Sequence, residues 1–165
     1  MVKPRQQRVV GWRERADLPE LGLSDIKVKI DTGARTSALG VRHLRYLDRD
    51  GTLHVSFVLP GAARTKGERV VLPVHDQREI RNTGGVPQER PIVLTRLVIG
   101  DFAREIEVSL ADRASMKFPM IVGRTALKGA RIIVDPARSW RGARPLDPTP
   151  VRRPARSKSS EETGR

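Results

Sequence analysis

The 165-residue sequence contains no cysteine, which excludes disulfide bonds and thiolate metal sites. Aromatic residues make up only 4% of the chain and are scattered, so the paired aromatic side chains that stack RNA bases are not expected. No apolar run approaches the roughly 18 residues of a membrane-spanning helix, and the basic, polar first residues do not resemble a signal peptide. These absences favour a cytoplasmic protein without a membrane anchor.

Positive charge is abundant. The chain has 32 lysines and arginines against 19 acidic residues, a formal net charge of +13 and a sequence pI near 11.3. Residues 136–165 hold only 8 of the 32 basic residues, so the charge is not confined to the end of the chain. This charge predicts anionic partners such as RNA, the ribosome or acidic peptides.

Strand-like segments dominate from residue 8 to residue 135, and only one or two short helices are expected. The predicted strands are Arg8–Trp12, Ile26–Asp31, His54–Leu59, Arg69–Pro73, Ile92–Ile99, Glu105–Leu110, Met120–Val122 and Arg131–Val134. Asp50-Gly51 separates two alternating apolar segments, which predicts a hairpin with a two-residue turn. The sequence therefore predicts an all-β domain over residues 8–135. Residues 136–165, rich in Pro, Arg and Ser, are expected to form a disordered basic tail.

Two motifs point to chemistry. Ile30-Asp31-Thr32-Gly33-Ala34 follows an alternating segment, which puts a carboxylate at the end of a strand where a tight turn begins. Far downstream, Ile121-Val122-Gly123-Arg124 leads from an apolar strand through a Gly-Arg turn into a short helix. On its own, Asp-Thr-Gly is also ordinary turn chemistry, in which Asp31 would only cap the turn.

Together the two motifs resemble the retropepsin family of aspartic peptidases. The longer series Val10–Arg13, Ile30–Leu39 and Phe118–Arg124 resembles a bacterial branch of that family historically labelled ATP-dependent zinc proteases, over roughly residues 9 to 135. The resemblance implies a closed acid-protease β-barrel with a single lobe per chain. Because the sequence has one Asp-Thr-Gly, it also implies a homodimer in which the Asp31 residues of two copies meet at the two-fold axis.

The resemblance implies Asp31, Thr32 and Gly33 as catalytic residues. Two carboxylates within hydrogen-bond reach share a proton, so one acts as a base toward a bound water and the other as an acid toward the peptide carbonyl. The Thr32 hydroxyl is expected to hydrogen-bond across the dimer axis. Gly33 is expected to let a backbone amide approach the carboxylates.

The predicted substrate-binding residues lie in the floor of a cleft and in a flap. They are Ala34, Arg35, Arg124, Asn82, Thr83, Gly84 and Gly85. The four flap residues belong to a polar, glycine-containing segment, His75 to Arg90, whose order in the chain matches a retropepsin flap. The alternative is an exposed loop with no catalytic role.

Arg35 departs from the viral retropepsins, in which an Asp commonly follows this motif and pairs with the arginine of the Gly-Arg turn, here Arg124. Two arginines near one floor favour an acidic group between them, and arginine binds carboxylates bidentately. The sequence therefore predicts a preference for acidic, Glu-rich peptides. Some relatives in this branch are associated with enzymes that add glutamates to a ribosomal protein, which implies trimming of oligoglutamate tails.

Neither zinc nor ATP dependence is expected. The three histidines, His43, His54 and His75, lack the spacing of a helical zinc pair; His43 and His54 could face each other across a hairpin, but as a surface pair. No phosphate-binding G-x-x-x-x-G-K-[ST] loop occurs. The competing function is a non-catalytic basic β-barrel that contacts RNA or the ribosome electrostatically, in part through its tail.

Overall fold

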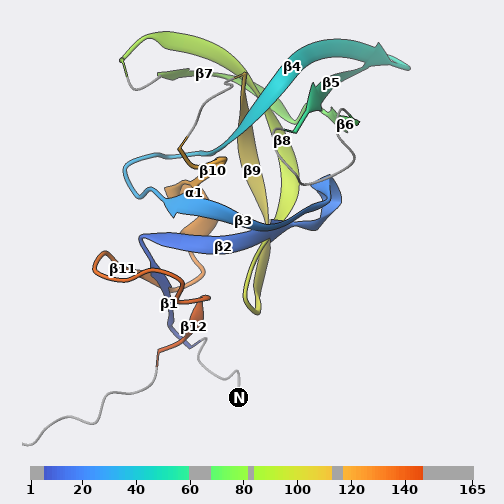
Figure 1. Ribbon diagram of the computed structural model, residues 1–165. Helices are drawn as coiled ribbons and strands as arrows, with labels where there is room; N and C mark the ends of the chain where they lie inside the picture. Colours follow the sequence, from blue (N-terminus) through green and yellow to red (C-terminus); the bar gives the residue numbers. More distant parts are fainter. Residues whose placement is uncertain (1–5, 60–67, 82–83, 113–116, 147–165) are drawn as a thin grey trace, which may run out of the picture.

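The computed structural model describes residues 6–59, 68–81, 84–112 and 117–146 (Figure 1). The strands are β1 (Arg8–Gly11), β2 (Arg13–Leu18), β3 (Leu23–Ile30), β4 (Ser37–Arg49), β5 (Thr52–Val58), β6 (Arg69–Pro73), β7 (Asp76–Arg81), β8 (Pro87–Ile99), β9 (Phe102–Asp112), β10 (Met120–Val122), β11 (Ile132–Asp135) and β12 (Arg144–Pro145). Within these ranges the helical turns are η1 (Pro19–Leu21) and α1 (Arg124–Leu127). None of the helices in this part of the chain is long and apolar enough to cross a membrane. The predicted all-β class is confirmed.

The strands of the larger sheet nearly close on themselves. β10 pairs with β3 on one side and with β4 on the other, so the order β3-β2-β8-β9-β4-β10 returns to β3. The link between β2 and β8 is a single residue pair, Asp17 with Val98. The strands therefore form a ring that is weakly paired at this one link, and the sheets do not make the clear closed barrel that was expected.

The core is built by strands of this ring and by the adjoining strand β5. Leu18, Val28, Phe57, Leu97 and Leu110 belong to one cluster and are almost completely buried. They come from β2, β3, β5, β8 and β9, and buried and more exposed side chains alternate clearly in β2, at the end of β3 and in the second half of β8. The two motifs, at the ends of β3 and β10, are therefore held by strands that pack into this core.

The hairpin turn predicted at Asp50-Gly51 is confirmed. Both residues have left-handed φ angles, 52° and 79°, and the flanking residues Arg49 and Thr52 are paired across the hairpin. Positive φ at both central residues is the geometry that Asp-Gly favours in a two-residue hairpin loop. β6 and β10 also have the predicted bounds, whereas β4 extends well beyond the predicted apolar segment.

Residues 136–146 do not begin a disordered tail, which corrects the predicted boundary at residue 135. β12 pairs with β1 in a small separate sheet with β11, at the lower end of the molecule in Figure 1. The buried Glu14 carboxylate accepts hydrogen bonds from the backbone amides of Gly11, Arg141 and Gly142 at 2.7–3.1 Å. These contacts order a segment that has few apolar side chains. The remainder of the predicted tail, 147–165, lies outside the described residues.

Candidate active site

Asp31 lies directly after β3, in a turn that fixes one of its carboxylate oxygens. Oδ1 accepts hydrogen bonds from the amides of Gly33 at 3.0 Å and Ala34 at 3.3 Å. The Asp31 amide donates to the carbonyl of Val122 at 2.9 Å, which ties the turn to β10. A Cβ on Gly33 would lie only 3.2 Å from Oδ1. Asp31 thus caps its own turn, and its partly exposed side chain keeps Oδ2 without a partner in the described part of the chain.

The Gly-Arg turn joins the Asp31 turn, although about ninety residues separate the two motifs. The Arg124 amide donates to the Ala34 carbonyl at 2.8 Å, and its guanidinium Nη1 donates to the carbonyls of Thr32 at 3.2 Å and Gly33 at 3.1 Å. The amide and hydroxyl of Thr125 both donate to the Arg35 carbonyl. This geometry gives Arg124 a positioning role in holding the turn. Arg124 also lines a hollow of about 720 Å³ together with Thr32 and Arg35, so the substrate contact that the sequence predicts stays a prediction.

Two buried serines, not identified from the sequence, complete this junction. Ser37 Oγ accepts a hydrogen bond from the Gly123 amide at 3.0 Å, and Ser109 Oγ donates to the Ser37 carbonyl at 3.1 Å. A Cβ on Gly123 would lie 2.6 Å from the carbonyl carbon of Thr36. A serine within a strand gives no sequence signal that its hydroxyl is buried, so only the fold shows the role of these two residues.

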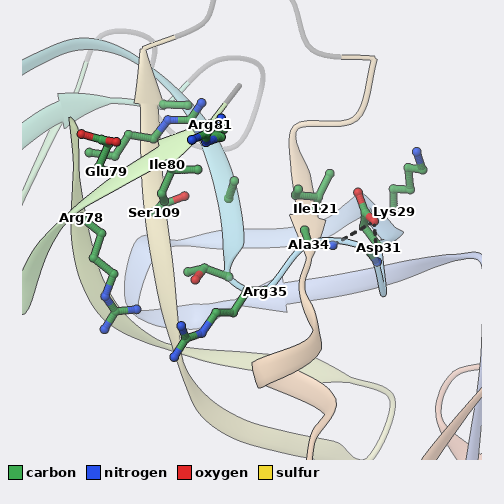
Figure 2. A pocket seen from close by; sticks show the side chains of 15 residues that line it. Lys29, Asp31, Ala34, Arg35, Arg78, Glu79, Ile80, Arg81, Ser109 and Ile121 are labelled. Atoms are coloured by element: carbon green, nitrogen blue, oxygen red, sulfur yellow. Dashed lines mark hydrogen bonds between the residues drawn. The ribbon is translucent and has the colours of Figure 1, made fainter. Parts of the chain in front are cut away.

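A cavity of about 650 Å³ lies between the Asp31 turn and β7 (Figure 2). Asp31, Gly33, Ala34 and Arg35 line one side, the β7 residues 78–81 line the other, and Ser109, Ala111 and Ile121 are also in the wall. The hairpin of β7 and β8 therefore borders the cavity, as expected of a flap. Of the predicted tip residues, Asn82 and Thr83 lie outside the described residues, while Gly84 and Gly85 are exposed and do not line the cavity.

The cavity wall carries more cations than anions. Lys29, Arg35, Arg78, Arg81 and Arg90 line it, against the carboxylates of Asp31 and Glu79. Arg35 also lines two neighbouring hollows of about 720 and 370 Å³. Its guanidinium forms no hydrogen bond or ion pair with any residue that the structure describes, and it is exposed. Arg35 therefore presents an available bidentate donor at the point where the three hollows meet.

An ion-pair network fastens β7 to β9. The Arg78 guanidinium donates to both Glu107 oxygens, at 2.5 and 3.0 Å, and its Nε donates to Asp76 at 2.7 Å. Hydrogen bonding to Arg78 holds the pKa values of Glu107 and Asp76 below their usual range, and its hydrogen bond to Glu107 is the main reason that the pKa of Arg78 is raised. Because the pKa of Glu107 is lower in the folded state, its contribution to stability is present above about pH 4.5 and is lost as the pH falls further.

Replacing Glu107 with Gln is expected to lower the free energy of unfolding by about 1 kcal/mol at pH 7, since the side chains of the pair are about one-third exposed and solvent screens them. The difference from wild type is expected to be smaller at pH 3, because the stabilisation by Glu107 is lost as the pH falls through its lowered folded-state pKa. Urea unfolding at both pH values measures it, and amide exchange should show faster opening of β7 at pH 7. Glu105→Gln, on the same strand, is the control. An equal loss at both pH values would contradict the ion-pair account.

The histidines are not arranged as a metal site. Among the described residues, no group of three or more His, Asp or Glu side chains is placed to hold a metal ion. His54 lies opposite Leu47 in the β4–β5 hairpin, whereas His43 lies at an irregularity of β4, so the suggestion that they face each other is wrong. His75 Nε2 lies 3.4 Å from a Glu107 oxygen, next to the β7 anchor.

Comparisons with known proteins agree with the motifs. The profile of the RimB-like family, described as retropepsin-like aspartic endopeptidase RimB, matches residues 9–144. A probable alpha-L-glutamate ligase of Parasynechococcus marenigrum is 36% identical over 130 residues, covering 78% of this chain and 28% of the relative. A protein of the same name from Desulfotalea psychrophila is 35% identical over 133 residues, with 79% and 28% covered. The chain thus spans little more than a quarter of the length of these relatives.

The fold has a counterpart among solved structures. A Legionella pneumophila protein of unknown function superposes with a TM-score of 0.66 at 26% sequence identity, and the match covers 82% of this chain and 98% of that one. The match of the family profile extends through the segment that folds back onto β1, beyond the boundary expected from the sequence. The chain belongs to the RimB-like family of retropepsin-like aspartic endopeptidases.

Proposed function

We propose that this protein is an aspartic endopeptidase whose active site forms when two copies bring their Asp31 side chains together. The observation that carries the proposal is the Asp31 turn. One carboxylate oxygen is held by two backbone amides, the turn is fixed by Arg124, and the side chain borders a cavity of about 650 Å³. The two amides orient the carboxylate as a catalytic group needs, and the adjoining cavity is a feature that a turn cap alone would not require.

The need for a second copy follows from the carboxylates available to one chain. The mechanism requires two carboxylates within hydrogen-bond reach. Glu79 is the other acidic residue in the described cavity wall, and Figure 2 shows it across the cavity from Asp31, on β7. Thr32 and Gly33, which follow Asp31, are exposed and so are available to a partner. A two-fold axis beside Asp31 supplies the second carboxylate.

In this dimer the pair of carboxylates shares one proton. The ionised member takes a proton from a bound water, whose oxygen forms a bond to the peptide carbonyl carbon, while the protonated member donates to the carbonyl oxygen. The tetrahedral intermediate then breaks at the C–N bond. The nitrogen takes the proton that the first carboxylate gained from water, while one hydroxyl of the intermediate returns its proton to the other carboxylate as the C=O bond re-forms, so one carboxylate is again protonated. The amides of Gly33 and Ala34 keep Asp31 in place through the cycle.

Acidic peptides are the proposed substrates. The unpaired guanidinium of Arg35 and the other cations of the wall favour carboxylate side chains. The curated relatives, which share this region, are named as probable alpha-L-glutamate ligases. A domain that removes glutamates is a chemically consistent companion to an activity that adds them, so we propose oligoglutamate tails as the substrate class.

Cleavage of a mixed peptide library with neutral and Glu-rich members, between pH 4 and pH 8, tests the proposed function. The fraction of dimer is recorded by sedimentation at each pH. We expect the rate of cleavage to increase with the dimer fraction, and we expect the cleaved peptides to be mainly the Glu-rich ones. A stable dimer that cleaves no member of the library would contradict the proposal and favour a binding function.

Arg35→Ala is expected to reduce kcat/KM for a Glu-rich peptide about tenfold, the size of one lost charge-assisted hydrogen bond. For a neutral peptide of the same length we expect less than a threefold change, since Arg35 has no partner inside the described protein. Arg45→Ala, which removes an exposed cation from β4, is the matched control. Equal losses on both peptides would instead indicate a structural role for Arg35.

A further inference from the structure

Four cations face one another on the outer side of β2 and β3. In the antiparallel register Arg13 lies opposite Lys29 and Arg15 lies opposite Lys27. Arg15, Lys27 and Lys29 are exposed and Arg13 is half-buried. Like charges directly opposite each other on a sheet are destabilising. This cationic quartet therefore lowers the stability of the sheet that carries it, which suggests a role outside folding.

The quartet is only slightly neutralised by its surroundings. Arg15 reaches Asp25 at 3.4 Å, where both side chains are largely exposed. Arg13 donates to the Ser139 hydroxyl at 2.9 Å, a neutral partner. Neither Lys27 nor Lys29 has a hydrogen bond or ion pair to the part of the chain that the structure describes. The quartet thus has capacity for several carboxylates.

Trp140 orders the two arginines of the quartet. The guanidinium carbons of Arg13 and Arg15 each lie 5.0 Å from the centroid of its ring, and Arg13 is also 4.6 Å from the ring of Trp12. Stacking on an aromatic ring leaves the N–H edges of a guanidinium free to bind an anion. The arginines are therefore held in position before any ligand arrives.

The backbone of Trp140 is strained. Its φ of 59° lies in the left-handed region, which is strained for a large side chain. The strain is held by the hydrogen bond from its amide to the Arg13 carbonyl at 3.0 Å and by the neighbouring amides of Arg141 and Gly142, which bind the buried Glu14 carboxylate. The hydrogen bonds of the buried Glu14 carboxylate and the strained backbone of Trp140 thus hold the indole ring over the two arginines.

The quartet leads to the candidate active site. Lys27 and Lys29 are alternate residues at the end of β3, so they lie on one face about 7 Å apart, the spacing of alternate side chains in an extended peptide, and Asp31 follows directly in the turn. Lys29 also lines the cavity of about 650 Å³, and Figure 2 shows its ammonium directed away from this cavity, beside Asp31. A chain that leaves the cavity at this edge meets the quartet next.

We propose that the quartet of Arg13, Arg15, Lys27 and Lys29, ordered by Trp140, is a docking surface for an acidic, extended segment of the polypeptide substrate outside the cavity. The inference rests on the proposed peptidase function. It assigns substrate affinity to residues away from the reacting carboxylates. Glutamates of one tail bind the quartet while another part of the same tail occupies the cavity.

A single-stranded RNA fits this surface less well. Binding of RNA without sequence preference combines a basic groove with aromatic rings on which bases stack. The ring of Trp140 is already covered by two guanidinium groups, although 42% of the residue remains exposed. Tyr46, the other exposed aromatic residue of the described chain, lies on β4 and not on β2 or β3. The observations therefore favour carboxylates over nucleotides.

Binding of a fluorescent ten-residue oligoglutamate to the Asp31→Asn protein tests the docking surface without cleavage. Lys27→Gln/Lys29→Gln is expected to weaken binding about fivefold to tenfold, the size of two solvent-exposed ion pairs. Arg45→Gln/Arg49→Gln, which removes the same charge from β4, is expected to weaken it less than twofold. Trp140→Ala is expected to weaken binding as well, and Trp140→Phe to restore most of it, because a ring again stacks on the arginines.

The outcomes separate the docking surface from the peptidase activity. Equal affinity in the two double variants would overturn the docking surface even if the wild-type protein cleaves peptides. A selective loss in Lys27→Gln/Lys29→Gln would support it even if no cleavage is found. Tighter binding of a decauridylate than of the oligoglutamate, lost in the same variant, would overturn the assignment to an acidic polypeptide. Circular dichroism of each variant confirms that it is folded.

Discussion

Asp31→Asn is expected to reduce peptide cleavage at least a thousandfold, because general acid–base chemistry by a positioned pair of carboxylates accounts for a factor of this order. Asn keeps an oxygen that can accept the hydrogen bonds from Gly33 and Ala34, which lie 3.0 and 3.3 Å from Oδ1. The turn should therefore survive, and the free energy of unfolding should change by less than about 1 kcal/mol. Initial rates on a Glu-rich peptide and urea unfolding of the same preparation measure both.

Glu79→Gln is the control that identifies the second carboxylate. Glu79 lines the cavity on the side of β7 and is the other acidic residue in the described wall. If the second carboxylate is Asp31 of another copy, this variant should keep more than a tenth of the wild-type rate. Loss of activity in Glu79→Gln comparable to that in Asp31→Asn would mean that one chain supplies both carboxylates, and the dimer would no longer be needed.

Gly123→Ala is expected to lower the free energy of unfolding by about 3 kcal/mol and to abolish activity. A Cβ at this position would lie 2.6 Å from the carbonyl carbon of Thr36 and 2.9 Å from both the Arg35 oxygen and the Ser37 nitrogen. These are backbone atoms, which cannot rotate away, so overpacking must separate β10 from the start of β4. Thermal unfolding and cleavage rates of the variant measure the two effects.

Gly33→Ala gives the matching comparison. Its Cβ would meet only the Asp31 Oδ1 atom, at 3.2 Å, and no backbone atom within 4 Å. We expect a loss of stability below about 1 kcal/mol, together with a clear loss of activity because the carboxylate is displaced. If Gly123→Ala were no less stable than Gly33→Ala, the close contact between the Gly-Arg turn and β4 would not be the support that we infer.

Much of the fold follows from hydrophobic periodicity, and the strands that were not foreseen show where periodicity fails. β2 has the sequence Arg13–Leu18, in which Glu14 occupies an inward position that an apolar residue would normally fill. Glu14 is tolerated there because amides 127 and 128 residues away bind it. A partner so distant in the chain leaves no local signal. The same contact explains why residues 136–146 are ordered.

β7 lacks the apolar alternation of a predicted strand because most of its residues are polar. Within the described residues Asp76–Arg81 pairs with β8 alone, so it is an edge strand whose side chains form ion pairs such as that of Arg78 with Glu107. Its composition is that of a loop, and the sequence therefore left a hairpin and an irregular loop as alternatives.

The candidate site was foreseen in part. The motifs identified Asp31 and the Gly-Arg turn, but the direction of a side chain depends on the assembled fold. Arg124 binds two carbonyls of the Asp31 turn, whereas Arg35 points into hollows where no described group pairs with it. The motifs predict the same substrate-binding role for both arginines. Only the surroundings of each side chain in the fold distinguish a residue that positions the turn from one that could bind the substrate.

The most direct test of a shared active site is the activity of wild-type protein mixed with increasing amounts of Asp31→Asn, under conditions in which subunits exchange. If both Asp31 residues are needed, activity per wild-type subunit should fall in proportion to the wild-type fraction and be halved in an equal mixture, because mixed dimers lack one carboxylate. An activity per wild-type subunit that stays constant across the series, with mixed dimers shown to form, would contradict the account.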